Sequence, residues 1–428
     1  MRSVKRQRGA AMLLLVIAGA ALLGVVGLAL DASHLGYMKA RLQATVDAMA
    51  LSAAKRLDQV GEPSAACDAA LQTMIDNEED FRELSDASPP SISCAADPWF
   101  TIEYSASAVP FVSGSTPARY VRVRIAGLET GASLSRVLGF GTLEVTASAI
   151  AGPSASVAEL CSLLPVAVCG SNTPPYYGFT PGNVYVLKGR KNESDGTNFG
   201  DFHLLRPDDP NQDDGTLKLR QTFAGGFAEC RLISSSGPPD PTVRIKPGAN
   251  TGPVAQGVNA RFDEYKPSGQ LDPAQFPPDV LIVEPSPLLT VDKAGVIRQG
   301  STIITEGSQI VGSDGATNLR QSYLARLAQG PSAYDIAPLP APGRGALLRR
   351  EVAVPIANCS APIDTNALPI IGAGCFFLSQ RMTDGGGEST LFGEFLTDCE
   401  AAGRPGSGGG TGGPYVIQLL RDPGSNDS

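Results

Sequence analysis

The longest apolar run of the chain lies close to its N-terminus. Residues 9–30 read GAAMLLLVIAGAALLGVVGLAL and include no charged side chain. At a rise of about 1.5 Å per residue, a helix of this length spans about 33 Å, which matches the hydrocarbon core of a bilayer. Residues 1–8 carry four basic side chains, and Asp31 follows the run. The positive-inside rule therefore predicts a cytoplasmic basic tip, a membrane helix in contact with lipid, and the rest of the chain outside the cytoplasm.

A second pattern begins where the apolar run ends. Between residues 31 and 60, apolar residues recur every three or four positions with charged residues between them, which predicts an amphipathic helix that continues the first one as a stalk. A cleaved secretory signal is disfavoured, because its apolar core is only about 7 to 15 residues long. The apolar stripe of the stalk consists of Leu35, Met38, Leu42, Val46, Met49, Ala53 and Leu57.

Two partners for this stripe stay open. It packs on the protein's own domain, as in most surface helices, or it packs on neighbouring subunits of a helical fibre. Within the apolar run, Ala20 and Gly24 form a pair of small residues that lets membrane helices approach closely. The candidate helix-packing face therefore consists of Ala20, Gly24, Leu35, Met38, Leu42, Val46 and Met49.

The segment from residue 61 to residue 152 combines helical and strand patterns. A second helix is predicted over residues 65–83. Apolar and polar residues then alternate as in half-buried antiparallel strands over residues 99–107, 120–125 and 143–149. We expect a first α+β unit here.

Residues 153–428 are predicted to form a second unit that is rich in strands and loops. Clusters of Gly, Pro, Asn and Asp separate its short apolar runs, and these are turn signals rather than helix signals. Proline-rich stretches at 264–290 and 331–345 predict ordered loops, and the glycines of residues 402–413 predict a flexible loop. Strands are expected over residues 183–188, 202–204, 217–219, 242–245, 351–356, 374–378 and 415–420. The predicted fold class of the whole chain is α+β.

Eight cysteines, an even number, are spread along the chain, and none belongs to a C-x-x-C pair. This spacing argues against zinc and favours disulfides in an oxidising compartment. Eight cysteines allow 105 pairings. Proximity suggests Cys67 with Cys94, Cys161 with Cys169, and Cys359 with Cys399. The candidate disulfide cysteines are Cys67, Cys94, Cys161, Cys169, Cys230, Cys359, Cys375 and Cys399.

Charge and catalytic motifs exclude several classes of function. The net charge is −9 and the basic residues beyond the tip are scattered, so we expect no nucleic-acid partner. The chain has two histidines, His34 and His203, so a histidine-based catalytic triad or a two-histidine metal site would have to use one of them. Ser52 and Lys55 fit S-x-x-K, but the partner motifs of penicillin-binding proteins are missing. The acidic string at 208–215 lacks the glycine and glutamate of an EF-hand loop. We predict no enzyme, no cofactor and no metal site.

The N-terminal 58 residues carry a more specific pattern. The stretch RGAAMLLLVIAGAALLGVVGLALDASHLGYMKARLQATVDAMALSAAKRL resembles the N-terminal signature of the Tad (Flp) pilus-assembly proteins of the TadE/TadG-like family. The glutamate that processed pilins carry five residues after the glycine is replaced by Leu14, so the resemblance is closer to TadG-like anchored proteins. The signature positions are Gly9, Asp31, Tyr37, Leu42, Gln43, Asp47 and Ala48.

The resemblance implies a bacterial inner-membrane protein with a cytoplasmic N-terminus and a periplasmic bulk. Its partners would be other pilus or pseudopilin subunits and the inner-membrane assembly platform, which it would meet through helix packing and domain surfaces. A fibre-tip adhesin or binding module shares every physical feature above and stays an alternative. An envelope hydrolase is a second rival, and it would need a nucleophile and a base brought together from distant loops.

Overall fold

The computed structural model resolves two compact units, Met1–Gly152 with Gln418–Ser428, and Pro153–Ile417. The architecture is α+β: a long apolar N-terminal helix is followed by mixed and β-rich sheets. The structure describes residues 8–77, 94, 99–131, 142–155, 157–189, 200–207, 215–233, 241–248, 250–266, 271–292, 296–304, 309–312, 315, 317–329, 345–360, 363–383, 389–406 and 412–424.

Two helices form one layer of the first unit. The apolar run and the stalk are one continuous helix, α1 (Arg8–Val60). Gly61 follows with a φ of +77°, a left-handed conformation that glycine adopts without a steric cost, and lets the chain turn back. Helix α2 (Pro63–Asp76) then starts with a proline in its first turn, where no helical N–H bond is lost. It buries Ala66, Cys67, Ala70 and Met74.

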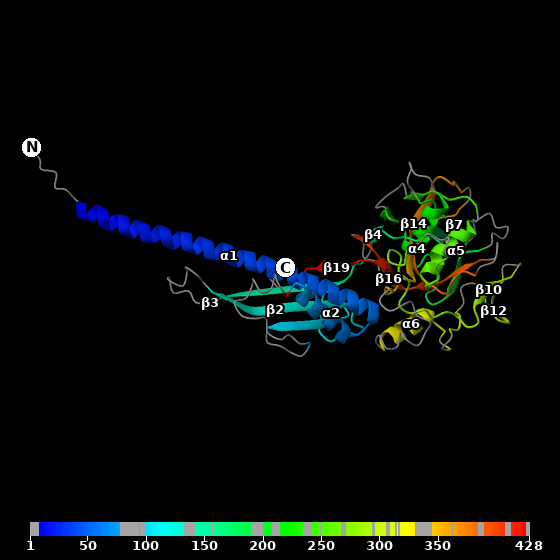
Figure 1. Ribbon diagram of the computed structural model, residues 1–428, viewed down its shortest axis with the longest axis horizontal. Coiled ribbons are helices and arrows are strands. Elements are labelled where there is room, and N and C mark those ends of the chain that lie inside the picture. Colours follow the sequence, from blue (N-terminus) through cyan, green and yellow to red (C-terminus); the bar gives the residue numbers. More distant parts are fainter. Residues whose placement is uncertain are drawn as a thin grey trace, which may run out of the picture. The chain divides into compact units, whose positions relative to one another are not determined.

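A four-stranded sheet forms the other layer of this unit, and the C-terminal half of α1 packs on it (Figure 1). The alternation predicted from the sequence is present, since Val121, Val123 and Ile125 are buried while Arg124 between them is exposed. The predicted strands near residues 99, 120 and 143 are all confirmed. The sheet has the order β1 (Phe100–Ser105), β2 (Tyr120–Gly131), β3 (Thr142–Pro153) and β19 (Ile417–Leu420).

A seven-stranded mixed sheet is the centre of the second unit. Among the strand pairs that the structure describes in this sheet, β5–β13 is parallel and the others are antiparallel. The path of the sheet is β6 (Val184–Lys188), β15 (Leu391–Leu396), β14 (Leu368–Leu378), β13 (Glu351–Ala357), β5 (Val166–Cys169) and β7 (Phe202–Leu204), and β9 (Thr242–Val243) also pairs with β14.

Both faces of this sheet are covered. Val166 and Val168 of β5 belong to one buried cluster, and Ala167 and Cys169 belong to another. Because successive side chains of a strand point to opposite faces, the two clusters lie on the two sides of the sheet. This explains why β13, β14 and β15 are buried at almost every position rather than at alternate ones.

Three smaller sheets complete the second unit. They are β10 (Leu289–Val291), β11 (Ile297–Gln299) and β12 (Thr302–Ile304); β17 (Gly403–Pro405), β4 (Val157–Leu160) and β8 (Arg231–Leu232); and the parallel pair β16 (Asp398–Glu400) and β18 (Gly413–Tyr415). The predicted strand over 415–420 is therefore divided between β18 and β19.

Helices in the second unit correct the sequence-based prediction. The strand expected over 217–219 is wrong, because these residues belong to α4 (Thr216–Gly225). Two further helices, α5 (Thr251–Ala260) and α6 (Leu319–Leu327), lie where the sequence analysis predicted no element. Each is only two to three turns long, and α4 and α5 pack against each other, so tertiary packing rather than periodicity determines them.

Candidate functional site

The N-terminal half of α1 presents apolar side chains outward. Among the residues that the structure describes, α1 contains the one segment that is long and apolar enough, by length and composition, to cross a membrane. Met12 is 75% exposed and Leu28 is 51% exposed, and large apolar side chains between them, such as Leu15, Leu22 and Val25, have a similar exposure. Large apolar side chains at this exposure need a lipid or protein neighbour, because burying each one is worth about 1.5 to 3 kcal/mol.

Glycines leave gaps in this apolar surface. An added Cβ at Gly24 or at Gly19 would meet nothing within 4 Å. The surface at Gly24 is therefore open to the close approach of another helix. The side chain of Ala20, its predicted companion, lies outside the described residues.

The C-terminal half of α1 packs on the protein's own first unit. Its stripe from Met38 to Leu57 is almost completely buried, and α2 and β2 are the elements that pack against the helix. Leu35, where the stripe begins, is only partly buried. Of the two partners that the sequence left open, the structure thus supports the protein's own domain for Met38, Leu42, Val46 and Met49.

Two signature residues fasten α1 to the sheet. The side-chain amide of Gln43 donates a hydrogen bond to Asp47 Oδ1 over 2.7 Å, and it also donates to the carbonyl oxygen of Ser148 on β3 over 2.9 Å. Leu42 beside it is fully buried. Asp47 thus orients the amide that reaches the sheet, which gives the L-Q-x-x-x-D pattern a structural reason.

The other signature positions lie nearer to the apolar half. Asp31 is buried to 8% exposure. Tyr37 is half-exposed and its ring lies 5.0 Å below the Arg41 guanidinium, a cation–π contact. Ala48 is partly buried, and Gly9 lies in the first turn of α1.

Ser52 serves as a link between the two helices. Its Oγ lies 3.0 Å from the carbonyl oxygen of Met49, 3.3 Å from that of Ala69, and 2.7 Å from the hydroxyl of Thr73 on α2. Lys55 is exposed. The hydroxyl of the S-x-x-K match is thus engaged in the packing of α1 against α2.

All eight cysteines form disulfides, and two predicted pairings are wrong. Cys67–Cys94 forms as predicted. Cys161 pairs with Cys230 and not with Cys169, and Cys359 pairs with Cys169 and not with Cys399. Proximity along the chain misled the prediction, because β5 and β13 are adjacent strands although they are far apart in the sequence. The fourth disulfide is Cys375–Cys399.

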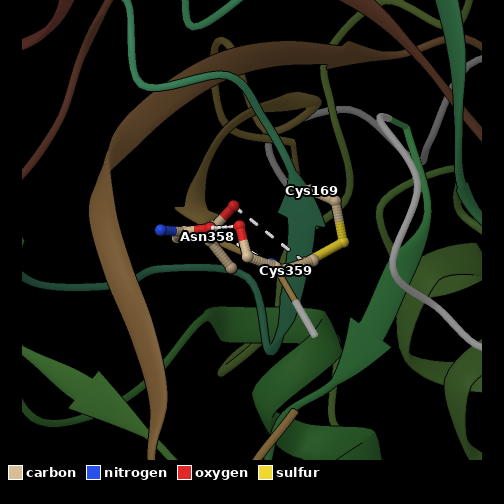
Figure 2. Close-up of a disulfide and its surroundings, with 5 residues drawn as sticks. Cys169, Asn358 and Cys359 are labelled. Carbon is tan, nitrogen blue, oxygen red and sulfur yellow. Dashed lines mark hydrogen bonds between the residues drawn. A yellow bond between two sulfur atoms is a disulfide. The ribbon is translucent and has the colours of Figure 1, made fainter. Parts of the chain in front are cut away.

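His203 lies beside the Cys169–Cys359 disulfide. Figure 2 shows this disulfide together with Asn358, which precedes Cys359. The two sulfur atoms and a ring nitrogen of His203 all lie within 4.8 Å of one another. The sequence could not indicate this group, because its members come from three distant segments. His34 is exposed on α1, and the acidic string lies outside the described residues except for Gly215.

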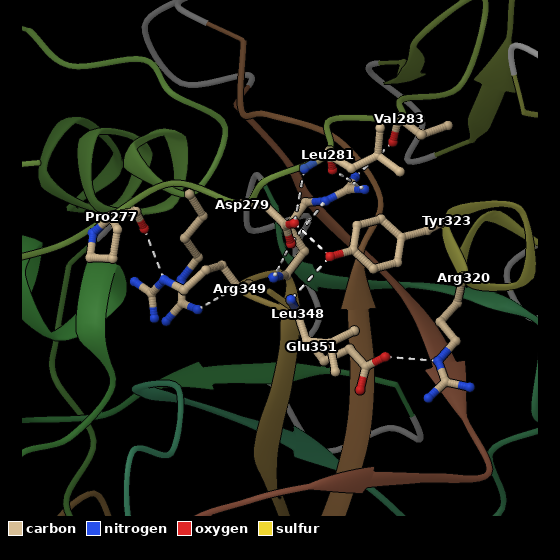
Figure 3. Close-up of polar contacts among 11 residues, drawn as sticks. Pro277, Asp279, Leu281, Val283, Arg320, Tyr323, Leu348, Arg349 and Glu351 are labelled. Atoms are coloured by element: carbon tan, nitrogen blue, oxygen red, sulfur yellow. Dashed lines mark hydrogen bonds and ion pairs between the residues drawn. The ribbon is translucent and has the colours of Figure 1, made fainter. Parts of the chain in front are cut away.

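A buried ion pair is the most charged feature of the second unit (Figure 3). Asp279 and Arg350 are both fully buried, with Arg350 Nε 3.8 Å from Asp279 Oδ2. The hydroxyl of Tyr323 donates to Asp279 Oδ1 over 2.6 Å, and the Arg350 guanidinium donates to the carbonyl oxygens of Leu281 and Val283. Desolvation raises the pKa of Asp279, and Arg350 acts against this rise.

Aromatic rings and backbone carbonyls surround these charges. The Arg350 guanidinium carbon lies 4.3 Å from the ring centre of Phe377. Arg349 donates to the carbonyl oxygens of Pro277 and Ala224 over 2.9 Å and 2.6 Å. These contacts join the segment around residue 279 to α4, α6 and β13. The cluster thus links separate segments of the second unit, and the charges of Asp279 and Arg350 compensate each other inside it.

Two further ionisable groups are buried near the sheet. Glu394 on β15 accepts hydrogen bonds through Oε2 from the backbone N–H groups of Leu319 and Arg320, at the first turn of α6. Burial raises the pKa of Glu394 to about 7. Burial also lowers the pKa of Lys188, at the end of β6, to about 8.

Comparisons with protein-family models, with curated proteins and with solved structures find no match to this chain. The N-terminal apolar helix and the four disulfides are typical of a membrane-anchored or secreted extracytoplasmic protein.

Proposed function

We propose that this protein is a membrane-anchored component of Tad/Flp-type pilus assembly, a minor pseudopilin-like or envelope-coupling subunit without enzymatic activity. It lies in the bacterial inner membrane with its N-terminus in the cytoplasm and its two disulfide-bonded units in the periplasm. Its partners are other pilus or pseudopilin subunits and the assembly platform.

The division of α1 into two halves is the observation that carries the proposal. The first half exposes its apolar side chains, whereas the second half is buried against α2 and β2 of the same unit. A helix fixed at one end to a folded unit and apolar at the other both anchors that unit in a bilayer and packs on similar helices. The resemblance of residues 8–57 to the TadE/TadG-like signature gives this helix its context.

The residue at position 14 favours an anchor that is retained. A glutamate in a membrane helix is costly, so where it occurs it has a function. Leu14 stands at that position and is 67% exposed, so this helix has the lipid-facing character of an unprocessed anchor. The subunit then acts in the membrane, by initiating, capping or coupling the fibre.

Intact mass measurement tests this proposal. The endogenous protein is isolated separately from membranes and from mechanically sheared surface fibres. We expect a mass that corresponds to a chain starting at or near Met1, confined to the membrane fraction. A chain that starts at Ala10 and is recovered with the fibres would identify a processed minor pilin. A full-length chain in the fibres would favour the adhesin.

A matched pair of variants tests helix packing directly. Gly24→Leu fills the open position of the candidate packing face, and Gly19→Leu adds the same side chain five residues earlier, on another side of the helix. We expect Gly24→Leu to reduce piliation and cross-linking to partner subunits, and Gly19→Leu to leave both close to wild type. If the two variants reduce piliation and cross-linking equally, or not at all, while the amount of protein in the membrane is unchanged, packing through this face would be contradicted.

A further inference from the structure

Strand register brings two cysteines and a histidine to one face of the seven-stranded sheet. Ala357 of β13 is opposite Cys169 of β5, and Cys359 follows two residues later. On the other side of β5, His203 of β7 is opposite Ala167. Because side chains alternate with a period of two, Cys169, Cys359 and His203 share a face and are diagonal neighbours.

The environment of the three groups suits a soft metal ion. Cys169 and Cys359 are buried in an apolar cluster with Ala167 and Ala357, and His203 is partly exposed at its edge. Thiolates and imidazole are the ligands that Zn²⁺ prefers, with sulfur at about 2.3 Å and nitrogen at about 2.0 to 2.1 Å. Neighbouring ligand atoms of a tetrahedral site are then about 3.5 to 3.8 Å apart.

The distances in the protein are close to this requirement. All three ligand atoms already lie within 4.8 Å of one another. Once the disulfide is broken, the two sulfurs need only separate to a distance of about 3.8 Å to bind one ion. Cys169 lies on β5 and His203 on β7, and Cys359 follows the end of β13 by two residues, so the three side chains are held close together by the sheet.

We propose that the reduced form of this protein binds one Zn²⁺ through Cys169, Cys359 and His203, and that the disulfide closes this site in the oxidised form. A phosphine supplies two electrons to break the S–S bond and takes an oxygen atom from water to become a phosphine oxide. The two protons of that water go to the two sulfurs. Zn²⁺ then displaces both protons, and water fills its fourth position.

Metal titration of the full-length protein in detergent is the first test. Co²⁺ is the probe, because its thiolate complexes absorb visible light and Zn²⁺ displaces it from them. We expect the phosphine-reduced protein to develop the thiolate–cobalt band and the oxidised protein to show none. This result does not depend on pilus assembly, so a failure of the metal-binding proposal can be distinguished from a failure of the proposed function.

Alkylation mapping identifies the ligands without any substitution. The reduced protein is treated with iodoacetamide with and without Zn²⁺, and its peptides are analysed by mass spectrometry. Zn²⁺ should protect Cys169 and Cys359, whereas the equally buried pair Cys375 and Cys399, which lies outside the group of three, should react as before. Unprotected Cys169 and Cys359, or equal protection of both pairs, would overturn the proposal.

Variants at position 203 test the third ligand. Loss of a partner that merely orients a ligand weakens metal binding by about 10- to 100-fold, so His203→Ala should weaken it by at least about 100-fold. His203→Cys supplies a thiolate at the same position and should restore most of the affinity. An unchanged affinity in His203→Ala would overturn the role of the imidazole, and the alkylation map remains decisive if this variant does not fold.

Discussion

The side-chain amide of Gln43 on α1 donates a hydrogen bond to the carbonyl oxygen of Ser148 on β3, over 2.9 Å. This contact joins two residues that are 105 positions apart in the sequence. It limits the rotation of α1 about its own axis on the sheet. The same amide also donates to Asp47. Together with the buried stripe of α1, this bond holds the helix in one orientation on its sheet.

Gln43→Leu should therefore destabilise the first unit. The substitution keeps the size of the side chain but leaves the carbonyl oxygen of Ser148 without this donor, which costs about 1 to 2 kcal/mol of unfolding free energy. Gln72→Leu is the control, because the hydrogen bond that Gln72 donates to Asp76 lies on the exposed side of α2. Urea denaturation in detergent measures both. A loss in Gln72→Leu as large as that in Gln43→Leu would refute a specific role for the bond.

The buried ion pair of the second unit gives a second prediction. Arg350→Met leaves Asp279 buried without its cation, and breaking a buried pair in this way costs about 3 to 5 kcal/mol. Arg404→Met is the control, since the Arg404–Glu159 pair, with 3.3 Å between Nε and Oε2, has an Arg side chain that is 83% exposed. Such pairs contribute about 0 to 1 kcal/mol. Comparable denaturation midpoints of the two variants would contradict this account.

Strands with alternating side chains were the predictable part of the fold. Val121, Val123 and Ile125 of β2 alternate with arginines, and their burial follows that pattern. The apolar stripe of α1 could also be predicted from its periodicity. Its packing partner could not, because the same stripe fits a neighbouring subunit or the chain's own sheet. Only the burial of Leu42 and Val46 in the first unit distinguishes the two.

Contacts between distant segments were beyond the sequence pattern. Cys169 and Cys359 are 190 positions apart in the sequence. The backbone N–H of Arg350 donates a hydrogen bond to the carboxylate of Asp279, which is 71 positions away. Such pairs depend on which strands become neighbours, which composition and periodicity do not specify. The group formed by His203 with Cys169 and Cys359 was missed for the same reason.

Glu394 gives the stability a pH dependence of known sign. Its pKa is raised from 4.5 to about 7 in the folded protein, so the folded state binds the proton more tightly than the unfolded chain. The stability that the protonated carboxyl contributes is complete below the unfolded pKa and is lost as the pH rises through the folded one. The expected loss is on the order of 1 to 3 kcal/mol between about pH 5 and about pH 8.

Glu394→Gln tests this sign. Glutamine keeps an oxygen acceptor for the N–H groups of Leu319 and Arg320 but has no charge to desolvate. The variant should therefore gain unfolding free energy relative to wild type as the pH increases from about 5 to about 8. Parallel pH profiles of the two proteins in denaturant titrations would show that Glu394 is not the group responsible.

Gly257 lies where α5, a helix that the sequence analysis did not predict, packs against α4. A Cβ at this position would overlap the carbonyl oxygen of Arg220 and lie 2.6 Å from Cβ of Phe223, so α4 and α5 approach each other through the glycine. Gly257→Ala should lower the unfolding free energy by about 1 to 3 kcal/mol, because the packed helices must separate.

Gly252→Ala on the same helix is the matched control. An added Cβ there meets nothing within 4 Å, and alanine is a better helix former than glycine by about 1 kcal/mol. This variant should keep the wild-type stability or gain up to about 1 kcal/mol. If Gly257→Ala lowers the unfolding free energy and Gly252→Ala raises it, close packing rather than helix propensity requires glycine at position 257. A gain in both would remove α4–α5 contact as the reason for this helix.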